Sequence, residues 1–252
     1  MAKPFSLLEI DLEKVVSKII SSNSVFNSEK ATEDNLVDAF AAASEVLIFG
    51  YPTKEVWLET EKERQRQKSL MNAVGNAQQE FIGHLAGFTS YPPTKKNPMP
   101  DVVGSREGQK IFAEIKNKHN TMNSKSAAAT YDTMVKFSER VEYNNYIGAV
   151  VQIISDVPKS GQAMWSPFAP GADRNARKNL IVMSGRVFYA IATDPKKRQP
   201  VTDFDSTEDL TKWESWCAID LMKDAFLKEL EKQTKKTVPD WVKALFSKSI
   251  GF

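Results

Sequence analysis

The sequence predicts an α/β protein with a central mixed sheet, helices on both sides of it and a helical N-terminal region. Residues 146–154 form the most apolar run of the chain, which is typical of a buried central strand. A strand, a helix and a second strand are expected in that order around residues 110–154, and this order indicates a crossover between parallel strands. The first 85 residues have mostly helical periodicity.

Three helices are expected in the N-terminal region. Residues 5–22 place apolar side chains at helical spacing, and a serine-rich stretch ends this pattern. A second helix begins near Thr32, has acidic residues in its first turn and stops at Gly50. A third and longer helix is expected over residues 54–85. We expect residues 1–90 to form a helical region that packs on the core.

Residues 91–252 are expected to form that core, with a sheet of about five strands. Two short apolar runs, 102–103 and 111–113, are separated by turn residues and predict an antiparallel hairpin. Prolines and glycines predict irregular structure over 156–178. The other expected elements are a helix at 125–141, strands at 146–154, 180–183 and 186–193 with a tight turn at 184–185, and helices at 208–233 and 239–247.

The composition is that of an ordinary soluble protein, with 41% hydrophobic and 26% charged residues among 252. The single cysteine, Cys217, excludes an internal disulfide, fits a reducing compartment and is expected to be a buried structural thiol. With only His84 and His119, a zinc site built from Cys and His is not expected. The N-terminus becomes charged too early for a secretory signal, and no apolar run reaches membrane-spanning length, so we expect a cytoplasmic protein.

Positive charge concentrates in the middle of the chain, although the net charge is only +2. Residues 102–200 carry 15 basic and 8 acidic side chains, whereas the segments on either side carry an acidic excess. A surface that binds phosphate around an acidic metal centre would produce this distribution. A solvated, mildly basic face would produce it too.

The hairpin contains a candidate catalytic site. Asp101 begins the first strand, and Glu114 and Lys116 lie two residues apart on the second, so their side chains share one face. Together they predict a hard-oxygen site for a divalent cation with a lysine beside it to handle a water molecule. The alternative is a solvated strand face. A second Pro-Asp pair, at 239–240, has no Glu-x-Lys after it.

Pro100-Asp101 followed by Glu114-Ile115-Lys116 resembles the P-D…(D/E)-x-K signature of the restriction-endonuclease-like nucleases. The continuation Asn117-Lys118-His119-Asn120-Thr121 is similar to type II restriction enzymes that cut GG-N-CC or GG-W-CC palindromes. The close match covers residues 100–121. The expected order of elements fits the nuclease superfamily over most of the chain.

This resemblance implies a magnesium-dependent type II restriction endonuclease that acts on double-stranded DNA as a homodimer, without a nucleotide cofactor. It implies that Asp101, Glu114 and the backbone carbonyl of Ile115 hold one or two Mg²⁺ ions, and that Lys116 orients the attacking water. Many enzymes of the superfamily take a further ligand from the helix before the first core strand. By position that residue would be Glu80, for which an exposed helix glutamate is the alternative.

Two loops are candidates for contact with DNA. The 118–126 loop, beside the proposed site, could position the scissile phosphate or enter a groove. The 156–178 loop carries arginines that could grip guanine, or that could merely neutralise backbone charge. The candidate residues are Lys118, Asn120, Thr121, Asn123 and Lys125 in the first loop, and Arg174, Asn175, Arg177 and Lys178 in the second.

Three other functions remain open at this point. A repair or recombination nuclease with the same core would share the metal residues but cut DNA structures rather than sequences. A non-catalytic DNA-binding module would be indifferent to removal of the metal. A helical regulatory or scaffold protein would carry residues 100–121 as a surface hairpin.

Overall fold

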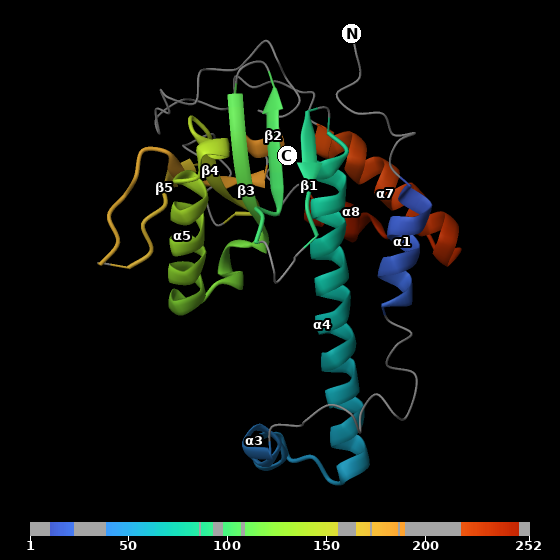
Figure 1. Cartoon of the computed structure of the whole chain (residues 1–252). Coiled ribbons are helices and arrows are strands. Elements are labelled where there is room, and N and C mark those ends of the chain that lie inside the picture. The colour runs from blue at the N-terminus through green and yellow to red at the C-terminus, as the bar shows by residue number, and fades with distance from the viewer. Residues whose placement is uncertain are drawn as a thin grey trace. The chain divides into compact units, whose positions relative to one another are not determined.

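Six strands form one mixed sheet in the computed structural model, in the order β1-β2-β3-β4-β6-β5. Figure 1 shows β1, β2 and β3 side by side in this sheet. The structure describes residues 11–22, 39–85, 87–92, 98–106, 109–155, 165–171, 173–185, 187–189 and 218–246. The strands are β1 (Phe88–Ser90), β2 (Val102–Arg106), β3 (Gln109–Lys118), β4 (Ile147–Ile154), β5 (Trp165–Pro167) and β6 (Leu180–Ser184). The α/β class with a mixed sheet and flanking helices is confirmed, with six strands where about five were expected.

The centre of the sheet follows the sequence prediction. β2 and β3 pair as an antiparallel hairpin, and both strands extend beyond the short apolar runs that predicted them. The chain then passes through a 3₁₀ turn, His119–Thr121, and helix α5, Ser124–Ser138, before it returns as β4, parallel to β3. β6 continues the sheet parallel to β4. The hairpin, the crossover helix and the buried central strand are confirmed.

Helix α5 covers one face of the sheet. Phe112 on β3 packs with Phe137 of α5, with ring centroids 6.0 Å apart, and with Tyr143. Gly148 on β4 leaves room for this aromatic contact, because a Cβ there would lie within 3 Å of the Phe112 ring. The buried members of this core are Phe112, Tyr131, Met134, Phe137, Tyr143, Val150, Phe168 and Leu180. This packing fixes β3, the strand that carries Glu114 and Lys116, against α5.

A predicted strand at 186–193 is wrong where the structure describes it. Residues 185 and 187–189 are helical, and residues 190–193 lie outside the described part of the chain. The Oγ atom of Ser184 accepts a hydrogen bond from the backbone N–H of Val187, which favours a helical turn directly after β6. Val187, Phe188 and Tyr189 are nonetheless buried, and the ring of Phe188 packs edge-to-face against Phe88 of β1. The apolar run was recognised correctly, but its conformation was not.

Two short strands were not predicted. β5 lies inside the segment expected to be irregular and includes Pro167. In the described part of the sheet it is the last strand and pairs with β6, and at such an edge the missing N–H of proline is tolerated. β1 pairs with β2 and has only three residues, too few to produce a recognisable alternation. Both strands depend on pairing with residues distant in sequence.

The described helices agree with the expected ones in position. They are α1 (Leu12–Ser21), α3 (Ala39–Phe49), α4 (Lys54–Gly83), α5, α7 (Ala218–Thr234) and α8 (Asp240–Phe246). Helix α3 ends as predicted, because Gly50 adopts φ +68° and donates to Val46 O. Residues 5–10, 32–38 and 208–217, which include Cys217, lie outside the described residues.

The chain divides into two units, one of residues 13–77 and one of residues 78–252 with 1–12. The sheet, α5 and all the candidate site residues belong to the second unit. The first contains α3 and most of α4. In the part of the chain that the structure describes, no helix is long and apolar enough to cross a membrane.

Candidate active site

Asp101 is tied directly to the strand that carries the other two candidate residues. It immediately precedes β2, and its Oδ2 accepts a hydrogen bond of 2.9 Å from the backbone N–H of Ile115 on β3. Its own carbonyl accepts a hydrogen bond from the N–H of Tyr91. Because Ile115 lies between Glu114 and Lys116, this contact places the Asp101 carboxylate beside both of them.

Glu114 and Lys116 project from the same face of β3, as strand alternation requires. Lys116 Nζ lies 3.5 Å from Glu114 Oε2. The side chain of Ile115 points to the opposite face and is buried there. Phe112, which belongs to the buried aromatic core under α5, lies on the same face of β3 as this charged pair. The side chains of Glu114 and Lys116 are only partly open to solvent.

The pKa values of Asp101 and Glu114 are both raised, mainly because the two carboxyl groups are buried. Burial, followed by the nearby charge of Asp101, raises the pKa of Glu114 from 4.5 to about 7, although Lys116 offsets part of this. Burial also raises the pKa of Asp101, against the opposing effects of the Ile115 hydrogen bond and Lys116. A bound cation would stabilise the ionised form of both carboxylates and so lower their pKa values.

The donor set at this site suits a hard divalent cation such as Mg²⁺, because both side chains supply oxygen atoms. Among the described residues, no group of three or more Asp, Glu, His or Cys side chains is placed to hold a metal. Glu80 lies near the end of α4, where its backbone carbonyl is 2.7 Å from His84 Nδ1. Neither the Asp101–Ile115 nor the Lys116–Glu114 contact involves Glu80, so its role as a ligand stays a prediction.

The strand register brings one further polar residue to the site. Gln152 on β4 pairs with Lys116 on β3, and side chains of paired residues in neighbouring strands share a face. Gln152 is the only polar residue in the strand sequence IGAVVQII and is only partly buried. Its amide can accept a hydrogen bond from an ammonium group or donate one to a phosphate oxygen. A single amide within an apolar strand was the available sequence signal, but only the register shows that it lies beside Lys116.

The 118–126 loop lies at the C-terminal end of β3, two residues beyond Lys116. Thr121 Oγ1 donates to the carbonyl of Lys118, and Asn123 caps α5 by accepting from the N–H of Ser126 at 2.8 Å. Asn120, Thr121, Asn123 and Lys125 are exposed and Lys118 is partly exposed. The structure thus gives Asn123 a role in ending the loop and leaves the other polar side chains at the surface.

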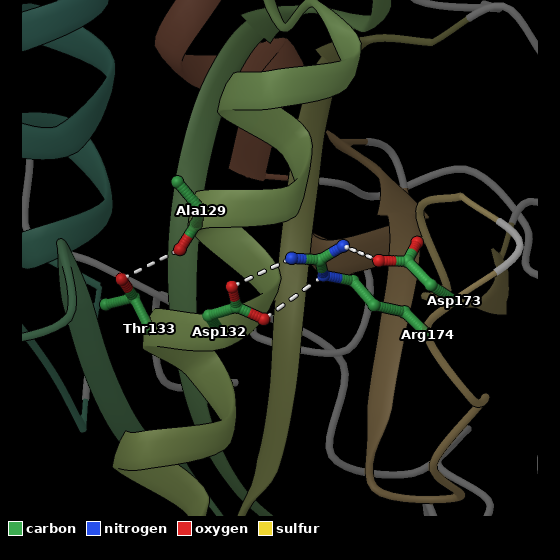
Figure 2. A network of polar contacts seen from close by, with 5 residues as sticks. All are labelled: Ala129, Asp132, Thr133, Asp173 and Arg174. Atoms are coloured by element: carbon green, nitrogen blue, oxygen red, sulfur yellow. Dashed lines mark hydrogen bonds and ion pairs between the residues drawn. The ribbon is translucent and has the colours of Figure 1, made fainter.

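Arg174 is held by carboxylates in this structure (Figure 2). Its Nε and Nη2 donate to the two oxygens of Asp132 on α5, at 3.1 and 2.9 Å. Its Nη1 donates to Asp173 at 2.9 Å. The hydrogen bonds to Arg174 lower the pKa of Asp132. All three guanidinium nitrogens are therefore engaged, and Arg174 would have to leave Asp132 to form the same two-pronged contact with guanine.

The rest of this loop also rests on α5. Arg177 Nη1 lies 3.2 Å from Glu139, and the hydroxyl of Tyr131 donates to the carbonyl of Asn175 at 2.5 Å. Among the residues that the structure describes, the side chain of Arg177 contacts Glu139, and it is more exposed than that of Arg174. Asn175 and Lys178 have exposed side chains. The loop is thus fixed by Arg174 and Tyr131, while Arg177 and Lys178 are more available to a partner.

The family model described as Eco47II restriction endonuclease matches residues 7–199 of this chain. The chain belongs to the Eco47II restriction endonuclease family. Two curated relatives are the type II restriction enzyme Sau96I of Staphylococcus aureus and the type II restriction enzyme Eco47II of Escherichia coli. Each is 29% identical to this chain, over 166 and 174 residues respectively. These matches confirm the resemblance to type II restriction enzymes that residues 100–121 suggested.

The alignments cover most of this Eco47II-family chain but not all of either relative. The match to Sau96I spans 63% of this chain and 60% of Sau96I, and the match to Eco47II spans 66% and 68%. The family model includes the whole β2–β3 hairpin and α5. The candidate site and both candidate DNA-binding loops therefore lie within the part of the chain that defines the family.

Proposed function

We propose that this protein is a Mg²⁺-dependent type II restriction endonuclease that cleaves double-stranded DNA at a short palindrome resembling GGNCC. One observation carries the proposal: the Asp101 carboxylate accepts a hydrogen bond from the N–H of Ile115. Ile115 lies in the chain between Glu114 and Lys116, whose side chains are paired. Membership of the Eco47II family supports the choice of DNA as the substrate and a specific sequence as the target.

Asp101 and Glu114, with the backbone carbonyl of Ile115, would hold one or two Mg²⁺ ions, and Glu80 would be a further ligand. The metal, when bound, polarises the scissile phosphate and lowers the pKa of a water molecule. Lys116 would hold that water through its ammonium group and favour its deprotonation. The water would lose a proton to solvent as its oxygen bonds to phosphorus. The bond from phosphorus to the 3′ oxygen would break and that oxygen would take up a proton from solvent, which leaves a 5′-phosphate and a 3′-hydroxyl.

The basic and polar side chains around the site would hold the DNA backbone. Lys118, Asn120, Thr121 and Lys125 lie in or directly after the loop that leaves β3, and Asn123 fixes its junction with α5. Contacts of this kind position the scissile phosphate without reading sequence. Asn175, Arg177 and Lys178, together with Arg174, form the second candidate surface for DNA.

A palindromic target has two-fold symmetry, so we propose a homodimer in which each subunit cuts one strand. The protein would act in the cytoplasm, where incoming DNA is accessible to it.

The direct test is incubation of the protein with unmethylated phage DNA and Mg²⁺, followed by sequencing of the fragment ends. We expect discrete fragments whose ends share one short palindrome, and no cleavage in EDTA. Fragmentation only at mismatches or junctions would favour a repair or recombination nuclease. DNA binding with no cleavage under any divalent metal would favour a non-catalytic DNA-binding protein.

Arg177→Ala is expected to weaken binding to the cognate duplex by roughly 1–3 kcal/mol, with a much smaller loss on a scrambled duplex, if Arg177 reads a guanine. Arg174→Ala is expected to have the smaller specific effect, because its guanidinium is already saturated by Asp132 and Asp173. Binding of both variants to both duplexes should be measured across a salt series. Equal losses on the two duplexes, with a flatter salt dependence, would reduce the loop to phosphate contact.

Asp132→Ala separates two roles for Arg174. If Arg174 only fixes the loop to α5, removal of Asp132 should reproduce the effect of Arg174→Ala. If Arg174 instead exchanges Asp132 for guanine on binding DNA, removal of Asp132 should strengthen specific binding while Arg174→Ala weakens it.

A further inference from the structure

Helix α3 has exposed apolar side chains around most of its circumference. No residue of Ala39–Phe49 is buried. Four of its large apolar side chains are mostly exposed: Phe40 at 88%, Leu47 at 83%, Ile48 at 73% and Phe49 at 69%. A helix that is apolar all round is normally buried. A patch of this kind on a protein surface marks an interaction site.

The polar groups of α3 are already satisfied within its own unit. Glu45, the only ionisable residue of the helix, accepts a hydrogen bond of 3.0 Å from the indole N–H of Trp57 on α4. The hydroxyl of Ser44 donates to the carbonyl of Phe40. The large exposed side chains of α3 are therefore apolar, and an apolar surface is the partner that they fit.

We propose that α3 is the surface through which two copies of this chain associate. DNA is a poor occupant, because α3 contains no lysine or arginine to meet phosphate. A second copy of α3 is complementary to the first, since two largely apolar helices can pack about a two-fold axis with Glu45, the one charged residue of each, turned toward Trp57 of its own unit. Because a second copy is required for the cutting of both strands, this assignment rests on the proposed function.

The exposed area on one side of α3 is a substantial part of what a dimer needs. At about 100° per residue, Phe40, Leu47 and Ile48 share one side of the helix, whereas Phe49 lies opposite Phe40. A large aromatic side chain buries roughly 150–250 Å² and leucine or isoleucine somewhat less, so these three side chains supply roughly half of the ~800 Å² that each partner contributes to a standard interface. Val56, at the start of the neighbouring helix α4, is also exposed and belongs to the same unit.

The test is the mass of the full-length protein by sedimentation velocity and light scattering, with neither DNA nor metal present. The wild type is expected at twice 28.3 kDa. Leu47→Glu is expected at 28.3 kDa, with the dissociation constant of the dimer raised roughly 100-fold, because a carboxylate would be buried at the centre of an apolar interface. Ile48→Glu is a second variant with the same expectation. Val141→Glu is the matched control, since Val141 is 94% exposed on the other unit, and this variant should remain dimeric.

A wild-type protein that stays monomeric at micromolar concentration would overturn the proposal. So would Leu47→Glu and Ile48→Glu variants that dimerise like the wild type, or dissociation of Val141→Glu to the same extent. Circular dichroism confirms that the variants are folded. A wild-type dimer that depends on Leu47 but cuts no DNA would uphold the interface and overturn the nuclease, so the two proposals fail separately.

Discussion

Asp101→Ala or Glu114→Ala is expected to lower DNA cleavage by roughly 10³-fold or more while the protein stays folded. Each variant removes one of the two carboxylates that would hold Mg²⁺ at the centre of the site. The fold should survive, because burial and the charge of Asp101 raise the pKa of Glu114, so that removing one carboxylate relieves the other. The measurement is the single-turnover cleavage rate with enzyme in excess over a cognate duplex and saturating Mg²⁺.

Glu142→Ala is the matched control for these variants. Glu142 is an exposed carboxylate whose partner, Arg140, is 3.6 Å away, and its loss should leave the cleavage rate within a few fold of wild type. Either active-site alanine variant that cuts at a near wild-type rate would sink the assignment of the metal site.

Lys116→Ala should show whether Lys116 acts in DNA binding or in the cleavage step. If Lys116 acts on the attacking water, the variant should bind the cognate duplex with near wild-type affinity and lose cleavage. If it loses binding and cleavage in parallel, Lys116 is a phosphate clamp. The 3.5 Å contact with Glu114 places the ammonium within the acidic centre, which favours the first outcome.

The local part of the site could be predicted from sequence because it depends on strand alternation. Glu114 and Lys116 are two residues apart on one strand, so any strand containing both places them on one face. The approach of Asp101 followed from the hairpin, since a short connection pairs β2 with β3. These are contacts whose sequence separation is small.

The remainder of the site depends on contacts that the sequence does not encode locally. Gln152 reaches Lys116 only through the register of two parallel strands joined by α5. Arg174 was expected to be available to DNA, but Asp132, on a helix far back in the chain, holds it in two hydrogen bonds. Nothing in the residues near Arg174 identifies that partner.

The errors in the fold have the same origin. The run after β6 is apolar and short, and such runs are compatible with a strand or with a buried helical turn. The hydrogen bond from the N–H of Val187 to Ser184 Oγ marks the helical alternative in the structure. Pro167 was interpreted as a breaker, but at the edge of a sheet it costs no ladder hydrogen bond.

The stability of the metal-free protein is expected to fall as pH rises from about 4.5 to about 7, and Glu114→Gln should reduce this dependence, leaving the part that comes from the raised pKa of Asp101. The pKa of Glu114 is about 7 in the folded protein and near 4.5 in the unfolded chain. Between these values the folded protein retains a proton that the unfolded chain has lost, so ionisation of the folded site opposes folding as pH rises. Below about pH 4.5 both states are protonated and the penalty is absent.

The expected penalty above pH 7 is about 1–3 kcal/mol, after allowance for the part of the Glu114 side chain that solvent reaches. Urea unfolding in EDTA at pH 5 and pH 8 measures it. The free energy of unfolding of Glu114→Gln, relative to that of the wild type, should be higher at pH 8 than at pH 5. Mg²⁺ added at pH 8 should raise the free energy of unfolding of the wild type more than that of the variant, because a ligand that binds only the folded state stabilises that state. A difference between the two proteins that is the same at both pH values, and unaffected by Mg²⁺, would show that Glu114 is neither a strained carboxylate nor a metal ligand.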